Sequence, residues 1–429
     1  MTLYFSQELV NLCYNVFNMS KNVIVIDARY AKVDTKKFNF GAFKKRLAKL
    51  ELPSFQTHKP NYNKIARTCK PYQKYKNIIV IANGGSRTSA LAYYQALQTK
   101  RNKKDVFFLS TMEPQLITEL KKKYRPKDTL VMPISKSGTN LDVLEPLTAF
   151  WDEYKILPVT SPHKGTLCEV AKKRKWDILE HPEVGGRYSG RSECAYGIAY
   201  LMGLDIKAID KAANIAYKDY GYRANLKQNQ AFLSALYCYL LERKGYTEIF
   251  APIYSFEYAG FLPLMIQLIH ESTGKGGRGQ TIFGDMAPES QHHTNQRFFG
   301  GRKNVLGFFI VNDRFMQQNK MANKIPEDLR DVPLRDGILS DIHKVPFDAG
   351  LHFDYQGVRE NAEARGIPHI VMTVKDTSYE SVGWFLSFWH YFTVYSALLR
   401  NQNPFDQPEV EAAKQISFEK RIKFQALKD

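Results

Sequence analysis

The sequence predicts an α/β protein built from two mainly parallel sheets, each flanked by helices. The chain has 429 residues, and single hydrophobic cores stop growing near roughly 250–300 residues, so two domains are expected. Hydrophobic residues make up 44% of the chain, which is enough for a sizeable core. Short β-branched runs alternate with stretches of helical apolar spacing. That alternation favours parallel sheets covered by helices.

The first set of alternating elements begins near residue 77. The run NIIVIA is a predicted strand that ends at the turn NGGS, and the residues after the turn have helical spacing. A helical stretch is also expected from about 140 to 153. Further strands are predicted at 105–111, 129–135 and 155–161. Residues 1–57 show no clean periodicity, and the sequence leaves their fold open.

A second set of elements follows a helical stretch at 206–245. Strands are predicted at 248–255, 304–312 and 369–376. A largely apolar helix is expected after the first of these strands, and a long one near the end of the chain. The polar, proline-containing segment 313–366 is expected to be an irregular insertion. The predicted divisions are an N-terminal segment, two α/β domains and a C-terminal segment, at 1–57, 58–205, 206–400 and 401–429.

The chain is strongly basic. It has 61 Lys and Arg against 43 Asp and Glu, a formal net charge of +18. Nucleic-acid binding is one interpretation, because clustered cations contact phosphates. The basic runs lack the interleaved aromatic residues of a base-stacking surface. A solvated cationic surface that also attracts anionic small molecules is therefore the favoured interpretation.

Cysteine spacing and the start of the chain bear on the compartment. The five cysteines have unrelated spacings and no CxxC pair, which argues against a disulfide framework or a zinc site and favours a reducing compartment. The first 22 residues lack the basic start of a signal peptide, and Glu8 interrupts their apolar run. No apolar run approaches the roughly 20 residues that span a bilayer. We expect a cytoplasmic protein.

Two hydroxyl-bearing turns follow predicted strands. The run PISKSGTN contains Ser135, Ser137 and Thr139 and opens a probable helix, so its hydroxyls and backbone N–H groups would form a pocket for a phosphate. The turn NGGS has the same placement one unit earlier, and Ser86 is expected to face the same ligand. The alternative is that both turns only begin helices.

The run EVGGRYS places Arg187 directly after two glycines. A guanidinium held on such a loop stabilises a developing oxyanion or enediolate. Without further context, a surface arginine beside a helix start is the simpler interpretation.

A polar stretch from 271 to 293 combines a glutamate, a glycine-rich loop and two histidines. A carboxylate with a histidine is a common acid/base pair, which suggests Glu271 with His292 or His293. The alternatives are a helix-end carboxylate, a polar loop pair, or a metal site. Asp285 and Glu289 lie near the histidines, but their spacing forms no compact metal motif.

At these residues the chain resembles glucose-6-phosphate isomerase, in its shorter bacterial form with two sugar-isomerase (SIS) domains. The motifs occur in the order of that family: NGGS, SKSGTN, EVGGRYS with YLMGLDI, HESTGK, a histidine followed by Gln296, and NPFDQPEVEAAK. Together they cover roughly residues 75–415. The resemblance implies two tandem SIS-type domains and the interconversion of glucose 6-phosphate and fructose 6-phosphate in glycolysis and gluconeogenesis. It implies no metal and no cofactor.

The resemblance also assigns roles to individual residues. Glu271 is similar to the general base that moves a proton between C2 and C1, and Arg187 to the arginine that stabilises the enediolate. His292 is similar to the ring-opening histidine, chosen over its neighbour on spacing, and Lys414 to the lysine that assists at the ring oxygen. The implied substrate-binding residues are Ser86, Ser135, Lys136, Ser137, Thr139 and Gln407.

Three positions depart from the family pattern: Arg87, Asn140 and His270. The alternatives are a bifunctional phosphoglucose/phosphomannose isomerase and a non-catalytic sugar-phosphate-binding SIS regulator. The presence of Glu271, His292 and Lys414 together argues against the regulator. The resemblance further implies a homodimer with composite active sites, no membrane partner, and a sugar phosphate rather than nucleic acid as ligand.

Overall fold

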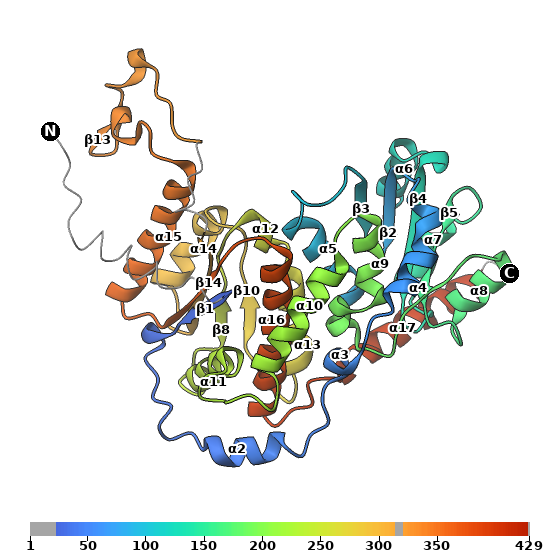
Figure 1. Cartoon of the computed structure of the whole chain (residues 1–429), viewed down its shortest axis with the longest axis horizontal. Helices are drawn as coiled ribbons and strands as arrows, with labels where there is room; N and C mark the ends of the chain where they lie inside the picture. The colour runs from blue at the N-terminus through green and yellow to red at the C-terminus, as the bar shows by residue number, and fades with distance from the viewer. Residues whose placement is uncertain (1–22, 314–320, 428–429) are drawn as a thin grey trace.

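A computed structural model describes residues 23–313 and 321–427 (Figure 1). The predicted absence of a signal peptide, and Cys13, therefore lie outside the described residues. The other four cysteines are buried free thiols: Cys69, Cys168, Cys194 and Cys238. Among the described residues, no helix has the length and apolar character needed to cross a bilayer.

The first sheet has the order β3-β2-β4-β6-β7, with β5 also paired to β4, and its pairings are parallel. Its strands are β2 (Asn77–Ile81), β3 (Asp105–Leu109), β4 (Thr129–Ser135), β5 (Lys155–Ile156), β6 (Val159–Thr160) and β7 (Leu179–Glu180). The strand predicted at 155–161 is divided into β5 and β6 at Pro158, which has no N–H to donate to a ladder. β7 was not predicted.

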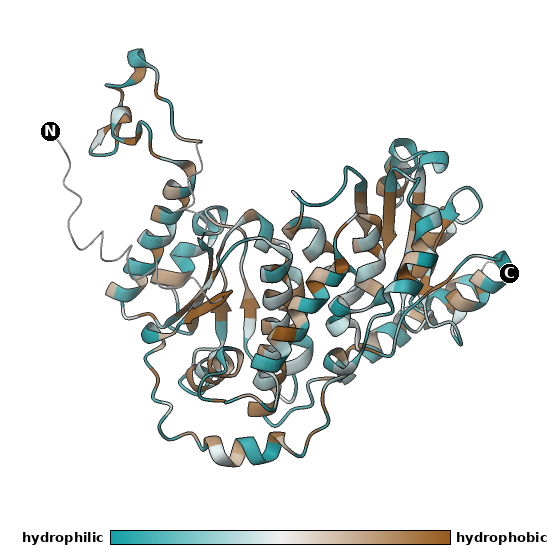
Figure 2. Cartoon of the chain, in the orientation of Figure 1, coloured by the Kyte–Doolittle hydropathy of each residue, from teal (hydrophilic) through white to brown (hydrophobic). Residues whose placement is uncertain are grey.

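Helices cover both faces of this sheet (Figure 1). Ile78 and Val80 face the core that includes α5, whereas Ile79 and Ile81 face the core that includes α7, because side chains alternate along a strand. The helices on the α5 face are α4 (Tyr62–Cys69), α5 (Gly85–Ala96) and α9 (Glu193–Leu201); those on the other face are α6 (Pro114–Lys123), α7 (Leu141–Thr148) and α8 (Thr166–Arg174). Figure 2 shows the strands as predominantly hydrophobic.

The second sheet has the order β1-β14-β11-β8-β10, with β9 paired to β11. β1 comes from the N-terminal segment whose fold the sequence left open, and it runs antiparallel to β14. β10 is a correction, because it lies within the stretch expected to be a loop. The strands are β1 (Ile24–Asp27), β8 (Glu248–Phe250), β9 (Ile253–Tyr254), β10 (Thr281–Phe283), β11 (Val305–Asn312) and β14 (His369–Val374).

Two groups of helices cover opposite faces of the second sheet. On one face, Phe308 contacts Trp389 of α16, and on the other face the next residue, Phe309, contacts Tyr355 of α15. The first face carries α10 (Ile206–Tyr220), α11 (Gln230–Glu242), α13 (Leu262–Thr273) and α16 (Tyr379–Leu399). The second face carries α14 (Glu289–Gly300) and α15 (Phe347–Ala364).

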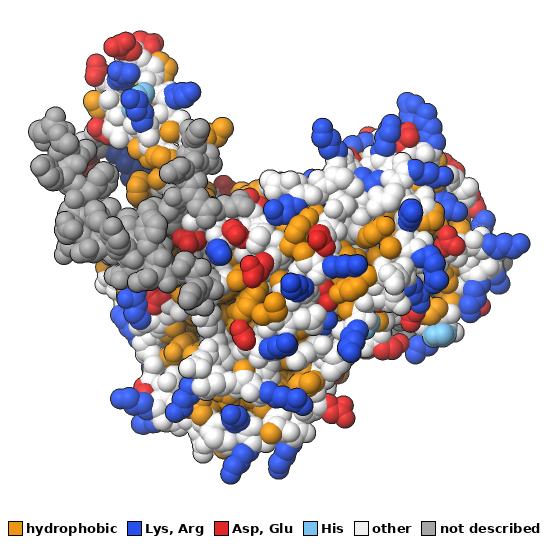
Figure 3. Space-filling model, in the orientation of Figure 1, with side chains coloured by type: hydrophobic (Ala, Val, Ile, Leu, Met, Phe, Trp, Pro, Cys, Tyr) orange, Lys and Arg blue, Asp and Glu red, His pale blue; other side chains and the backbone are white. Residues whose placement is uncertain are grey.

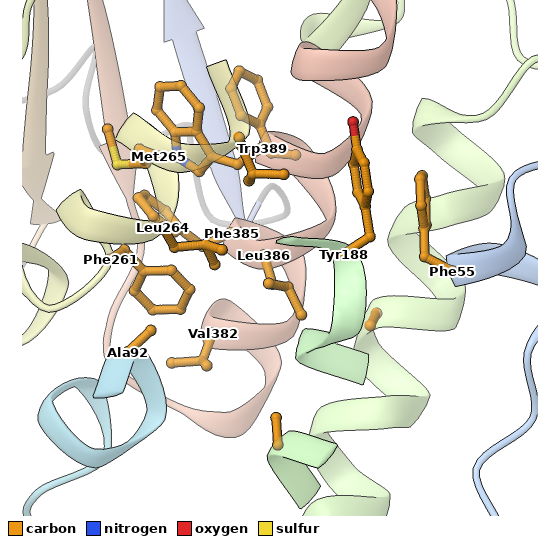
Figure 4. Close-up of a cluster of buried hydrophobic side chains, with 14 of the residues drawn as sticks. Phe55, Ala92, Tyr188, Phe261, Leu264, Met265, Val382, Phe385, Leu386 and Trp389 are labelled. Atoms are coloured by element: carbon orange, nitrogen blue, oxygen red, sulfur yellow. The ribbon is translucent and has the colours of Figure 1, made fainter. Parts of the chain in front are cut away.

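A single apolar cluster joins the two halves of the chain. Figure 4 shows Ala92 of α5 beside Phe261 and residues of α13 and α16, including Phe385 and Trp389. These side chains belong to one buried cluster that extends from the first sheet to the second. The domain limits given above stay a prediction, because the two sheets are separate while their helices share a core.

The segment predicted to be irregular at 313–366 is only partly so. Its last third forms the 18-residue helix α15 (Phe347–Ala364), which corrects the prediction. Residues 321–346 project from the second domain as an arm with a short hairpin, β12 (Pro333–Leu334) and β13 (Gly337–Ile338) (Figure 1). At the other end of the chain, α17 (Glu411–Ala426) reaches the first domain, where Arg421 pairs with Glu145.

Candidate active site

The hydroxyl-rich loop lies at the carboxyl end of β4, where the sequence predicted it. All seven residues of β4 are buried. The strand ends at Ser135, whose Oγ accepts a hydrogen bond from N of Gly138 (3.1 Å). Thr139 Oγ1 donates to Ser137 Oγ (3.0 Å). Gly138 has φ of +70°, a conformation that favours glycine.

The second turn lies beside this loop. β2 pairs with β4, so the turns that follow these strands meet at the same edge of the sheet. Ser86 is in the first turn of α5 and is buried. Lys136 forms an ion pair with Glu183 (2.8 Å). Each predicted phosphate-binding residue therefore belongs to one of two adjacent turns.

The glycine turn also touches the arginine loop. A Cβ added to Gly85 would lie 2.0 Å from O of Gly186 and 2.4 Å from N of Arg187. These are backbone atoms, so they can move away from an added Cβ only if the whole loop moves. A residue without a side chain is therefore needed at this contact.

Arg187 is buried, with 4% of its side chain exposed. Its Nη1 donates to Oε2 of Glu271 (2.9 Å) and to Oε1 of Gln407 (2.8 Å), and its Nε donates to Oγ of Ser272 (2.9 Å). Its Nη2 donates to the carbonyl oxygens of Pro404 (2.8 Å) and Asp406 (3.0 Å). The interpretation of Arg187 as a surface arginine is therefore wrong.

Glu271 lies in the last turn of α13, with 30% of its side chain exposed. Its second oxygen, Oε1, accepts from Nε2 of Gln267 (2.8 Å), and Oε1 of Gln267 accepts from Oγ1 of Thr88 (3.2 Å). The carboxylate is thus oriented from both sides, by Arg187 and by Gln267. It has enough exposure for a ligand to reach it.

Sequence reasoning missed two residues of this cluster, Gln267 and Ser272. Gln267 precedes Glu271 by one helical turn, and side chains four residues apart on a helix face each other, so the spacing could have identified it. Ser272 is buried and contacts both Arg187 and the hydroxyl of Tyr188 (3.2 Å). No sequence pattern marks this contact.

His270, one of the departures from the family pattern, has a structural contact. Its Nε2 accepts a hydrogen bond from N of Ile282 in β10 (3.0 Å). Burial lowers the pKa of His270 below its usual value. The neutral ring is the form that accepts this hydrogen bond.

The histidine pair is in α14 rather than in a loop. His292 is exposed, and within residues 23–313 and 321–427 it has no hydrogen-bond partner. His293 bonds through Nδ1 to Oγ1 of Thr294 (2.6 Å). α14 covers the face of the second sheet opposite to α13, so the structure does not bring His292 together with Glu271. No three His, Cys, Asp or Glu side chains of the described chain are grouped to hold a metal ion.

Lys414 also lies apart from the arginine cluster. It is in the first turn of α17, its side chain is 60% exposed, and its Nζ pairs with Oε1 of Glu411 (2.8 Å). Of the predicted C-terminal residues, the structure brings only Gln407 to Arg187.

Two sheets of this order, flanked by helices and joined through one core, form the fold class of two tandem SIS-type domains that the sequence predicted. A solved glucose-6-phosphate isomerase from Chlamydia trachomatis shares the fold with a TM-score of 0.68 and 19% identity, over 93% of this chain and 78% of that one. No family model matches the chain.

Within that class, the chain is similar in sequence to glucose-6-phosphate isomerases. The enzyme of Acholeplasma laidlawii is 28% identical over 82% of this chain and 85% of its own length. The enzyme of Methanocaldococcus jannaschii is 26% identical over 81% of this chain and 84% of its own length. These relatives confirm the resemblance that the motifs indicated.

Proposed function

We propose that this protein is an aldose–ketose isomerase that interconverts glucose 6-phosphate and fructose 6-phosphate in glycolysis and gluconeogenesis. The observation that carries the proposal is the buried Arg187, paired with Glu271 next to two hydroxyl-bearing turns. The similarity to glucose-6-phosphate isomerases along four fifths of the chain supports the same substrate. We include a cytoplasmic location in the proposal; the free thiols of the four described cysteines are compatible with it.

In this proposal Glu271 is the general base. The reaction needs a base that removes a proton from the carbon next to a carbonyl group and returns it to the neighbouring carbon. Gln267 and Arg187 fix the orientation of the carboxylate, and its remaining exposure leaves a path for substrate. Fixed geometry of this kind lowers the entropic cost of reaching the transition state.

Arg187 stabilises the intermediate. The enediolate carries negative charge on its oxygens, and a guanidinium held by carbonyl oxygens does not have to reorganise to meet that charge. Pro404 and Asp406 supply those carbonyl contacts. Nη1 of Arg187 donates to both Glu271 and Gln407. The same guanidinium therefore interacts with the carboxylate of the base and with the negative charge of the enediolate.

The phosphate group binds at the turns after β2 and β4. Hydroxyl groups and backbone N–H groups at the start of a helix are suited to a dianion. Lys136 contributes a cation, which is paired with Glu183. The implied contacts come from Ser86, Ser135, Lys136, Ser137 and Thr139.

We propose further that the enzyme is a homodimer with composite active sites. Glu271 is on α13 and His292 is on α14, and these helices cover opposite faces of one sheet. If the two residues act in one reaction, the histidine must therefore come from a second copy. The projecting arm carries apolar side chains suited to an interface, namely Met321, Leu329, Val332 and Leu334, which are 36–63% exposed.

A coupled assay with purified protein tests the activity. Glucose, mannose and fructose 6-phosphates are offered separately, and turnover of the glucose and fructose esters is expected. Turnover of the mannose ester as well would favour the bifunctional alternative. Tight binding of the esters without turnover of any of them would favour the regulator and contradict the proposal.

Mixing two inactive variants tests the composite site. Glu271→Gln and His292→Ala homodimers are each expected to be inactive, and subunit exchange between them gives heterodimers with one intact site. About half of the wild-type activity per heterodimer is expected, because closed twofold dimers have two equivalent sites. If heterodimers form and activity stays absent, the shared site is wrong.

A further inference from the structure

We propose that Lys275 is a positioning residue for the isomerase reaction, because it fixes residues 402–407 against Arg187 and thereby places Gln407. This inference rests on the proposed function. Lys275 lies two residues after the end of α13 and four residues after Glu271. The segment that it holds is more than 120 residues further along the chain.

The ammonium group of Lys275 donates all three of its hydrogen bonds to residues 403 and 406. Its Nζ donates to O of Asn403, to O of Asp406 (3.1 Å) and to Oδ1 of Asp406 (2.5 Å), which accounts for its three donors. Only 12% of its side chain is exposed, against 51% for Asp406. The backbone of Lys275 takes part as well, since its carbonyl accepts from Nε2 of Gln402 (2.6 Å).

The held segment is also the one that holds Arg187. The carbonyl oxygen of Asp406 accepts from both Nζ of Lys275 (3.1 Å) and Nη2 of Arg187 (3.0 Å). The carbonyl oxygen of Pro404 accepts from Arg187 and from the hydroxyl of Tyr188 (3.1 Å). Gln407, the next residue, accepts from Nη1 of Arg187. Two cations from distant parts of the chain, Lys275 and Arg187, therefore converge on the five-residue segment 403–407.

A simpler role for Lys275 is to interact with the carboxyl end of the α13 dipole. Cations near a helix C-terminus have that effect. It would not require contacts to a distant segment, and it would not require the side chain to be covered. The three bonds to residues 403 and 406 point instead to alignment of the C-terminal segment.

The expected consequence falls mainly on the chemical step. The proposed phosphate contacts lie on turns of the first sheet, and Lys275 touches none of them. Removing its charge releases residues 402–407, so Arg187 loses part of its support and Gln407 is no longer held in place. kcat should fall by much more than KM rises, because all the proposed phosphate contacts stay in place and Gln407 is the one implied substrate-binding residue that is released.

The test compares Lys275→Met with Lys122→Met, in which an exposed surface lysine that pairs with Glu119 is removed. We expect kcat of Lys275→Met to fall about 10- to 100-fold, since small misplacements of reacting groups have effects of that size, with KM changed less than about twofold. Backbone hydrogen exchange of residues 402–407 should become faster. Lys122→Met should match the wild type in all three measurements.

Asp406→Asn supplies a milder second variant, because it keeps the backbone contacts and removes one acceptor charge. A smaller fall in kcat and a smaller increase in exchange at 402–407 are expected. Two results for folded Lys275→Met would overturn the positioning role: a wild-type kcat, or a reduced kcat with unchanged hydrogen exchange at 402–407. If Lys275→Met does not fold, a wild-type kcat together with wild-type hydrogen exchange in Asp406→Asn would overturn it. An inactive wild type would instead refute the proposed function, and the exchange measurement would still report on the segment.

Discussion

Gly85→Ala tests the contact between the glycine turn and the arginine loop. The new Cβ would lie 2.0 Å from O of Gly186, whereas ordinary van der Waals contact begins near 3.4 Å. The difference, 3.4 − 2.0 = 1.4 Å, is the distance by which one of the two backbones must move. Arg187 directly follows Gly186, so the displacement reaches the guanidinium.

The expected loss follows from that displacement. A misplacement of about 1 Å can reduce catalysis about 10²-fold, so kcat/KM of Gly85→Ala should fall by at least that order. Forced packing should also lower the free energy of unfolding by about 1–3 kcal/mol. Steady-state kinetics in the coupled assay and thermal unfolding measure the two effects.

Gly357→Ala is the matched control. It makes the same change on an exposed position of α15, where an added Cβ meets nothing within 4 Å. Wild-type kinetics and equal or slightly higher stability are expected there, since alanine favours a helix more than glycine does. Wild-type kinetics and stability in Gly85→Ala would refute the reasoning, because the two loops could not then be in contact.

Three further predictions concern the base, the phosphate loop and a buried histidine. Glu271→Gln should bind substrate and lose about 10²-fold or more in kcat, since the amide keeps the size and removes the base; near-normal turnover would place the base elsewhere. Ser135→Ala with Thr139→Ala should raise KM about tenfold or more, because hydrogen bonds to a charged group contribute about 1.5–3 kcal/mol each; an unchanged KM would move the phosphate to another loop. Burial and Arg191 lower the pKa of His390 to about 3, so the folded state keeps the ring neutral while the unfolded state takes up a proton below about pH 6.5. Stability should therefore be lost as pH falls from 6.5 toward 3, by about 2 kcal/mol at pH 5, and His390→Gln should remove that pH dependence in chemical denaturation; parallel pH curves for the two proteins would contradict it.

Local patterns predicted the strands that carry the phosphate loops. β4 has seven buried residues and was predicted with the limits it has in the structure, because a fully covered parallel strand is a continuous apolar run. β10 was missed because three residues between glycine-rich turns form no measurable pattern. α15 was missed because it buries only three side chains, so its apolar stripe is narrow.

The arginine cluster shows what a single sequence cannot supply. The two glycines before Arg187 suggested a functional loop as one of two interpretations, but the burial of the guanidinium depends on carbonyl oxygens more than 200 residues away. Every residue has a backbone carbonyl, so the residue types in a sequence do not indicate which carbonyl accepts such a hydrogen bond. The roles of His292 and Lys414 stay predictions, since both side chains are exposed and lie outside the cluster.

The apolar cluster around α13 and α16 makes the two halves depend on each other for folding. Phe261, Phe385 and Trp389 belong to a buried cluster that contains side chains of both halves, so separating the halves would expose part of this cluster to water. Neither half can complete its core before the other is present. The chain should accordingly melt in one cooperative transition, and a ligand bound at Arg187 should protect the first sheet and the second sheet to the same extent.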